Sequence, residues 1–168
     1  IVVLMLLIGY EFIKAVRYAA MNRVLQKKVY IDGATGLPNR NKCDELLSQP
    51  DAAPEDIGVC SFDLNNLRII NNSMGHEAGD EYIRRFAVCL RASMPAEQFV
   101  GRAGGDEFIA LLNDVTQQDV EDIILQVQNE ARCYNEFSKQ IFIDFAFGYA
   151  LSTHSRETNL KLLLNQAD

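Results

Sequence analysis

The segment Gly104–Glu107, which reads Gly-Gly-Asp-Glu, places two carboxylates directly after two glycines near the middle of the chain. The flanking apolar segments, 98–103 and 108–112, are predicted to be strands, so the glycines form the turn of a β-hairpin. Adjacent acids repel each other unless a cation neutralises them. Glycines have no side chains, which lets phosphate groups approach the backbone closely. The alternative is an ordinary surface hairpin with solvated acids.

A third acid, Asp63, stands near the end of an apolar segment that is predicted to be a buried strand. Strand and helix patterns follow in the order β-α-β-β-α-β, with strands at 57–64, 98–103, 108–112 and 140–151 and helices at 75–94 and 116–131. This order predicts an α+β, ferredoxin-like fold with a palm-like sheet, in which the first strand lies beside the third. The fold therefore brings Asp63 close to Asp106 and Glu107.

Three clustered carboxylates without a cationic partner are unfavourable unless a divalent cation binds them. Oxygen ligands of this kind suit Mg²⁺, and Mn²⁺ is an acceptable substitute. Phosphoryl-transfer enzymes hold a pair of such ions about 3.5–4 Å apart, where they stabilise the attacking and leaving oxygens. The sequence therefore predicts a site for two Mg²⁺ ions.

Composition narrows the class of partner. The net charge of −7 and the sequence pI of about 4.8 argue against nucleic acid as the main partner. A single nucleotide remains compatible, provided that a divalent cation lies between its phosphates and the carboxylates. The hydrophobic content of 48% is enough for one main domain, expected over 31–168. The four cysteines form no C-x-x-C pair, which favours reduced, buried thiols in a cytosolic domain.

Residues 1–30 differ from the rest of the chain. The run of eight apolar residues at the start is too short to cross a bilayer, which needs about 20 residues. Residues 14–28 contain five basic residues and no acid, which is typical of a cytoplasmic membrane flank. We interpret 1–30 as the end of a transmembrane segment and a linker helix, anchored in a bacterial inner membrane before residue 10. An ordinary amphipathic helix is the alternative.

The segment 62–83 is rich in amides. Asn71 and Asp80 together offer a hydrogen-bond donor, an acceptor and a carboxylate, a combination that suits guanine. Asn and Asp are also common helix caps. On spacing alone, helix capping is the favoured interpretation of both residues.

Three segments, "DGATGLPNR" (32–40), "FDLNNLRIINNSMGHEAGDEYI" (62–83) and "RAGGDEF" (102–108), resemble the signature segments of GGDEF-domain diguanylate cyclases, in the same order and at similar separations. The resemblance covers about residues 30–168. It implies a nucleotidyl-cyclase-like palm fold and the Mg²⁺-dependent condensation of two GTP into cyclic di-GMP and two pyrophosphates. Each domain of the family binds one GTP, so the resemblance also implies a homodimer, regulated here through the N-terminal helix. The alternative is a non-catalytic GTP-binding module that controls a partner domain.

The resemblance also implies roles for single residues. Asp63 and Asp106 would bind the metal ions with the carbonyl of Leu64, and Glu107 would be a further ligand or help to activate the 3′-hydroxyl. Guanine recognition by Asn71 and Asp80 replaces the capping interpretation. The remaining implied contacts are phosphate binding by the main-chain amides of Asn66 and Leu67 and at Gly104 and Gly105, with basic positions at Arg68 and Arg102 whose contacts stay open.

The chain departs from the family pattern at two places. Where many relatives carry an R-x-x-D product-inhibition motif, this sequence has Pro95-Ala96-Glu97-Gln98, which predicts that the product-inhibition site is absent. Relatives also continue beyond the segment "NQAD" with a helix whose lysine and arginine contact the terminal phosphates. Since the sequence stops at Asp168, we expect the domain to be truncated at its C-terminal end.

Overall fold

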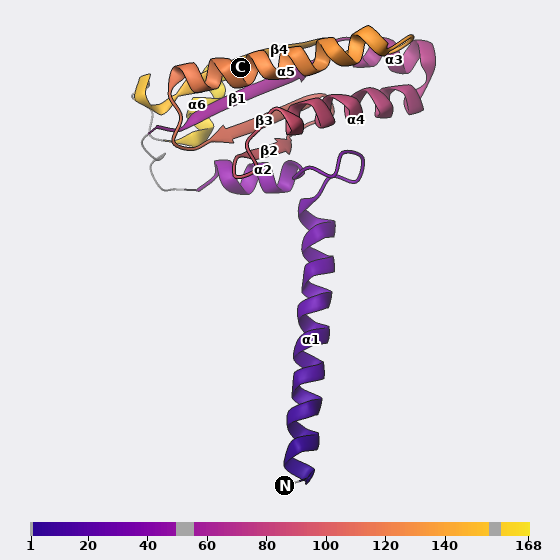
Figure 1. Cartoon of the computed structure of the whole chain (residues 1–168), viewed down its shortest axis with the longest axis vertical. Helices are drawn as coiled ribbons and strands as arrows, with labels where there is room; N and C mark the ends of the chain where they lie inside the picture. The colour runs from indigo at the N-terminus through magenta and orange to yellow at the C-terminus, as the bar shows by residue number, and fades with distance from the viewer. Residues whose placement is uncertain (1, 50–55, 155–158) are drawn as a thin grey trace.

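The structure is a computed structural model that describes residues 2–49, 56–154 and 159–168 (Figure 1). The helices are α1 (Val2–Tyr30), α2 (Arg40–Leu47), α3 (Leu67–Met74), α4 (His76–Ala92), α5 (Gln117–Phe137) and α6 (Leu160–Ala167), with a short 3₁₀ turn at Ser152–His154. The strands are β1 (Gly58–Leu64), β2 (Phe99–Arg102), β3 (Glu107–Leu112) and β4 (Phe145–Leu151).

The four strands form one antiparallel sheet in the order β2-β3-β1-β4. This confirms the predicted α+β fold with β-α-β-β-α-β order, in which the first strand lies beside the third. The fourth strand was predicted too long at its start, because the backbone of Ile143 bonds to Asn135 of α5 instead of pairing with a strand. The Asn135 carboxamide accepts from the Ile143 N–H at 2.7 Å and donates to the Ile143 carbonyl at 2.8 Å.

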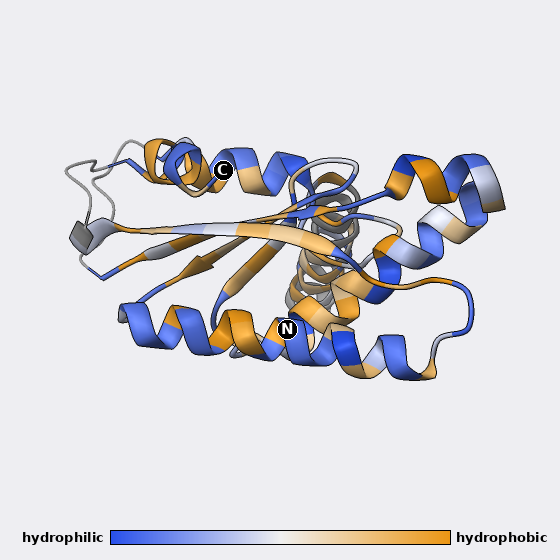
Figure 2. Ribbon diagram, turned by 90° about the horizontal axis from the view of Figure 1, so that it is seen from above, coloured by the Kyte–Doolittle hydropathy of each residue, from blue (hydrophilic) through white to orange (hydrophobic). Residues whose placement is uncertain are grey.

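Helices α4 and α5 cover one face of the sheet, and α2 and α6 cover the other (Figures 1 and 2). On the first face Phe62 and Phe108 pack against Phe86 of α4, whose ring centroid lies 5.0 Å from that of Phe108. On the second face Val59 and Ile109 pack with Leu163 of α6. Side chains alternate between the faces along a strand. Phe62 therefore points into the larger core, and the next residue, Asp63, lies on the face that carries α6.

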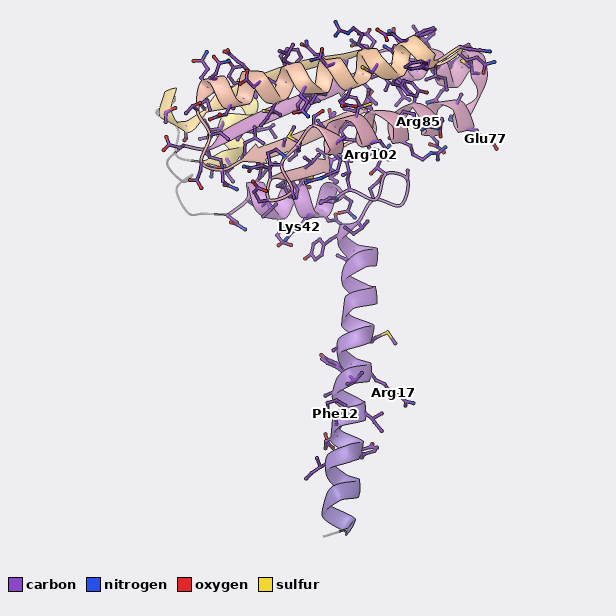
Figure 3. All side chains as sticks on the ribbon, in the orientation of Figure 1. Phe12, Arg17, Lys42, Glu77, Arg85 and Arg102 are labelled. Atoms are coloured by element: carbon purple, nitrogen blue, oxygen red, sulfur yellow. The ribbon has the colours of Figure 1, made fainter. Side chains whose placement is uncertain are left out.

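Helix α1 is one continuous helix of 29 residues that extends away from the domain (Figure 1). The side chains of Tyr10, Phe12 and Tyr18 are 64%, 69% and 71% exposed, and Phe12 and Arg17 lie far from the sheet (Figure 3). Among the described residues, no helix has the length and apolar character needed to span a membrane. The predicted transmembrane end therefore gains no support from the structure.

A break separates α1 from α2 between Tyr30 and Arg40. The Asn39 and Asn41 carboxamides donate to the carbonyl of Val29 at 2.9 and 3.2 Å, which satisfies a backbone acceptor at the end of α1. The ammonium group of Lys42 lies 5.2 Å from the centre of the Tyr30 ring, an attractive cation–π contact. The end of α1 is thus fastened to the start of α2.

The cysteine prediction holds for three of the four residues. Cys43, Cys60 and Cys89 are buried free thiols, whereas Cys133 is free but exposed on α5. Burial raises the pKa of the Cys60 thiol to about 12, so this side chain stays neutral and apolar in character at physiological pH.

Candidate active site

The exit of β1 and the turn between β2 and β3 lie side by side. Asp63 is directly opposite Glu107 in the pairing of β1 with β3. The Leu64 N–H donates to the carbonyl oxygen of Asp106 at 3.0 Å. These contacts bring the backbone of the three predicted acids to one corner of the sheet, as the strand order requires.

Two of the three acids at this corner share a hollow, and Asp106 is not among the residues that line it. Asp63 and Glu107 line a hollow of about 290 Å³ together with Ser61 and Asp168. Burial raises the pKa of the Asp63 carboxyl, and the negative charges of Asp106 and Asp168 raise it further. Within 2–49, 56–154 and 159–168, no three His, Cys, Asp or Glu side chains are already gathered in a metal-binding arrangement.

The donor chemistry of the corner nevertheless fits a hard divalent cation. Carboxylates from β1 and from the hairpin turn face the same hollow, and all of them are oxygen donors. Burial is the main cause of the raised pKa of Asp63, and a cation placed there would offset the second cause, the negative charges of Asp106 and Asp168.

The two turn glycines differ in what surrounds them. A Cβ atom on Gly104 would overlap the carboxylate of Glu107, whereas a Cβ on Gly105 would meet no atom within 4 Å. The turn is held by Glu107, whose carbonyl accepts from the Ala103 and Gly104 N–H groups at 2.9 and 3.2 Å. Gly104 therefore leaves room for Glu107, and Gly105 leaves the outside of the turn open.

Arg102 connects this turn to the segment that follows α1. Its guanidinium contacts both carboxylate oxygens of Asp32 at 3.2 Å and donates to the Gly105 carbonyl at 2.7 Å. Asp32 also accepts from the Thr35 hydroxyl at 2.7 Å and the Thr35 N–H at 2.9 Å. Burial raises the pKa of Asp32, but the hydrogen bonds from Thr35 and the charge of Arg102 outweigh burial and leave that pKa below its ordinary value.

The sequence left the contacts of Arg102 open and gave Asp32 no role. The side chains of Arg102 and Asp32 are only 15% and 21% exposed, and Figure 3 shows Arg102 on the side of the domain where α1 joins it. The two residues are 70 positions apart, so no local pattern reports their pairing.

The amides of Asn66 and Leu67 lie at the N-terminus of α3. Asn66 precedes the helix with a left-handed φ of 64°, and its carbonyl accepts from the Ile70 N–H at 3.0 Å. The first N–H groups of a helix have no partner within it and attract anions. Arg68 is exposed in the same first turn. These residues directly follow the exit of β1, so their amides lie close in sequence and space to Asp63.

Asn71 and Asp80 do not cap helices. Asn71 lies inside α3 and Asp80 inside α4, and the residues that precede the two helices are Asn66 and Gly75. The capping interpretation favoured by spacing is therefore wrong. Helices α3 and α4 instead fold back on each other, which places the carboxamide of Asn71 against Gly79, the neighbour of Asp80.

Comparison with known proteins identifies the family. A family model described as "Diguanylate cyclase, GGDEF domain" matches residues 29–168. The chain belongs to the GGDEF family.

Relatives of this GGDEF domain take part in both directions of cyclic di-GMP metabolism. The chain is 32% identical over 152 residues to the cyclic di-GMP phosphodiesterase PdeB of Shewanella oneidensis, covering 86% of this chain and 17% of PdeB. It is 30% identical over 115 residues to the diguanylate cyclase DgcP of Escherichia coli, covering 66% of this chain and 34% of DgcP. The chain thus spans only a minor part of the length of either relative.

A solved structure shares the fold over nearly the whole chain. The coiled coil and GGDEF domain of DgcB from Caulobacter crescentus, in complex with c-di-GMP, superposes with a TM-score of 0.80 and 18% identity. The superposition covers 96% of this chain and 88% of the DgcB chain.

Tyr82 of α4 supports this corner of the sheet, and the sequence analysis gave it no role. Its fully buried hydroxyl lies 2.9 Å from the Asn65 carbonyl and 2.6 Å from the Asp144 carbonyl, and it accepts from the Asp144 N–H at 3.1 Å. Tyr82 therefore fastens the exit of β1 to the segment before β4. The available signal was a tyrosine on an apolar helix stripe, because a buried tyrosine hydroxyl needs a polar partner.

The segment 95–98, where relatives carry the product-inhibition motif, is closed by internal hydrogen bonds. The Gln98 carboxamide donates to the Asn113 carbonyl at 3.1 Å and accepts from the Asn113 N–H at 2.8 Å. The Arg91 guanidinium donates to the Pro95 and Gln98 carbonyls at 2.9 and 3.1 Å. The Gln98 side chain and the Pro95 and Gln98 carbonyls are thus engaged with the protein itself, whereas the Glu97 side chain is exposed.

Proposed function

We propose that this GGDEF domain belongs to a diguanylate cyclase that condenses two GTP molecules into cyclic di-GMP and two pyrophosphates. Membership of the family and relatives on both sides of cyclic di-GMP turnover support a role in the metabolism of this nucleotide. The observation that carries the finer proposal is the pairing of Asp63 with Glu107 beside an intact Gly104–Glu107 turn.

In this proposal the carboxylates of Asp63, Asp106 and Glu107 and the carbonyl of Leu64 hold Mg²⁺. Bound Mg²⁺ lowers the pKa of the attacking 3′-hydroxyl and offsets the charge that develops on the α-phosphate. Glu107 lies opposite Asp63 in the sheet, which puts a second carboxylate within the same hollow to accept a proton or to complete the ligand set.

The other residues of the site bind and orient GTP. The N-terminal amides of α3, at Asn66 and Leu67, donate to phosphate oxygens, and the open side of Gly105 accommodates the phosphate chain. Asn71 and Asp80 read the guanine base from the α3–α4 pair. Arg68, exposed in the first turn of α3, adds positive charge near the phosphates.

A single domain holds one GTP in this proposal, so two domains have to face each other. The long α1 helix, with exposed Tyr10, Phe12 and Tyr18, offers a surface through which two copies associate. An oriented pair of bound substrates replaces a rare encounter between them, so the placement of the two α1 helices controls the rate. Attachment to the bacterial inner membrane and a cytoplasmic location of the domain remain predictions.

The test is incubation of the chain with GTP and Mg²⁺, followed by chromatographic detection of cyclic di-GMP and pyrophosphate. We expect product from the unaltered chain, none from Asp106→Ala, and unchanged product from Asp122→Ala, which removes an exposed acid on α5. A dimer that binds GTP but never forms cyclic di-GMP would rule out the cyclase assignment.

A second candidate is a GTP-binding module without catalytic activity that regulates a linked domain. It is favoured by the phosphodiesterase PdeB, in which the similar region is only 17% of the protein. It predicts that GTP raises the thermal stability of the chain without being consumed, and that GTP changes the rate of the linked domain.

A further inference from the structure

Gly79 lies directly beneath the side chain of Asn71. A Cβ atom at Gly79 would overlap Oδ1 of Asn71 and would lie 2.8 Å from its Cγ and 3.3 Å from its Nδ2. Gly79 is buried in the interior of α4, and its backbone is not in the left-handed region. Glycine costs about 1 kcal/mol relative to alanine at such a position. The helix does not need glycine here, so the reason for it is the space that Asn71 occupies.

We propose that Gly79 is a specificity-determining positioning residue for the guanine base, an inference that rests on the proposed function. Because Gly79 has no side chain, the Asn71 carboxamide packs against α4 at Gly79, the residue that directly precedes Asp80. Guanine presents acceptors at O6 and N7 and a donor at its 2-amino group. A carboxamide and a carboxylate held at a fixed separation match this mixture of acceptors and donors, whereas adenine presents a different one.

The surroundings of Gly79 predict that an added methyl group changes the site and leaves the fold intact. The three atoms nearest to the added Cβ all belong to the Asn71 carboxamide, the mobile end of a side chain that is only partly buried. A methyl group is therefore accommodated by rotation of Asn71 away from α4. Alanine also favours the helical state, so Gly79→Ala should have an equal or higher melting temperature.

The experiment is a double-mutant cycle with Gly79→Ala, Asn71→Ala and the combined variant. GTP affinity is measured by calorimetry with Ca²⁺ in place of Mg²⁺ to slow turnover, with ATP as the comparison nucleotide. We expect each single variant to weaken GTP binding by roughly three- to tenfold, the range of one lost hydrogen bond, and to change ATP binding less. In the combined variant the second substitution should add less than about a twofold loss, because both act through the same carboxamide.

A kinetic readout separates positioning from a general structural effect. Under turnover with Mg²⁺, Gly79→Ala should raise KM for GTP and leave kcat at saturating GTP within about twofold, because only ground-state binding of the base is altered. Glu77→Ala, which removes an exposed side chain from the first turn of the same helix, is the matched control and should leave both constants unchanged.

Several results would overturn the inference alone: unchanged GTP affinity in Gly79→Ala, independent losses in the combined variant, or failure of Gly79→Ala to fold. If the unaltered chain binds no GTP, the proposed function fails and this inference fails with it. Binding of GTP without turnover removes the cyclase assignment but leaves the role of Gly79 open to the calorimetric result.

Discussion

Two carboxylates near the Gly104–Gly105 turn, Asp32 and Asp63, have opposite environments. Asp32 receives hydrogen bonds from Thr35 and both oxygens contact the guanidinium of Arg102, so its pKa lies below the ordinary value despite burial. The pKa of Asp63 lies above the ordinary value, because burial and neighbouring negative charge both raise it.

The difference separates an acid that the protein uses for its own structure from one whose carboxylate has no hydrogen bond or ion pair within the described segments 2–49, 56–154 and 159–168. The charge of Asp32 is neutralised by Arg102, which also holds the Gly105 carbonyl and so fixes the turn from behind. The charge of Asp63 is opposed by burial and by the neighbouring charges of Asp106 and Asp168, a feature that is common at functional sites. In the absence of metal, the same substitution, Asp to Asn, should therefore have opposite effects on stability at the two positions.

The largest effect is expected for the activity of Asp63→Asn. Loss of a residue that merely supports a metal ligand costs about 10–100-fold in activity, so loss of a ligand should reduce cyclic di-GMP formation by at least about a hundredfold. The melting temperature without Mg²⁺ should stay the same or rise, because the substitution removes a repelled charge. A clearly lower melting temperature without metal would show that Asp63 is a structural acid, as Asp32 is.

A moderate effect is expected for the stability of Asp32→Asn. Loss of the ion pair with Arg102 should lower the melting temperature by about 2–4 °C, which corresponds to ~1 kcal/mol in a chain of this size. Asp44→Asn is the matched control. Asp44 is exposed and its ion pair with Arg40 is long, at 3.8 Å, so this substitution should change the melting temperature little. Equal stability of the Asp32 and Asp44 variants would show that the Asp32–Arg102 pair does not stabilise the fold.

The contributions of the Asp32 and Asp63 carboxylates to stability should depend on pH in opposite directions. The pKa of Asp32 is lowered on folding, so its contribution to stability is complete above the ordinary value of 3.8 and is lost as the pH falls through the lowered value. The pKa of Asp63 is raised, so in the absence of metal its ionisation reduces stability as the pH rises from 3.8 through the raised value. Melting temperatures of both variants and the unaltered chain, compared between pH 3 and 7, test this difference.

The smallest effect is expected from added cyclic di-GMP. Because this segment lacks the arginine and aspartate of the motif and its Gln98 is engaged with Asn113 and Arg91, the product should not inhibit turnover except by competing with GTP. Initial rates at saturating GTP should therefore be insensitive to cyclic di-GMP. Inhibition that saturating GTP fails to relieve would indicate a separate product site.

The strand order and the position of Asp63 beside the hairpin could be predicted from the sequence, because they depend on periodic patterns. Apolar alternation and the order of the elements determine that β1 lies beside β3, and this pairing alone brings Asp63 opposite Glu107. The first-turn amides of α3 were assigned through the family signature, which includes the residues that follow β1.

Other features depend on contacts that no local pattern encodes. The Asp32–Arg102 pair joins residues 70 positions apart, and the hydroxyl of Tyr82 meets Asp144 across 62 positions. The start of β4 was misjudged because the Asn135 carboxamide bonds to the backbone of Ile143. Helix capping by Asn71 was favoured because the sequence pattern predicted a helix from residue 75 but none over 67–74, where the structure places Asn71 inside α3.

The most direct measurement is calorimetric binding of GTP with and without Mg²⁺ to the unaltered chain, Asp63→Asn and Asp32→Asn. If the carboxylates beside the hairpin turn receive a cation together with the nucleotide, binding to the unaltered chain will depend on Mg²⁺. That dependence will disappear in Asp63→Asn and persist in Asp32→Asn. Equally tight, Mg²⁺-dependent GTP binding by Asp63→Asn would contradict the account.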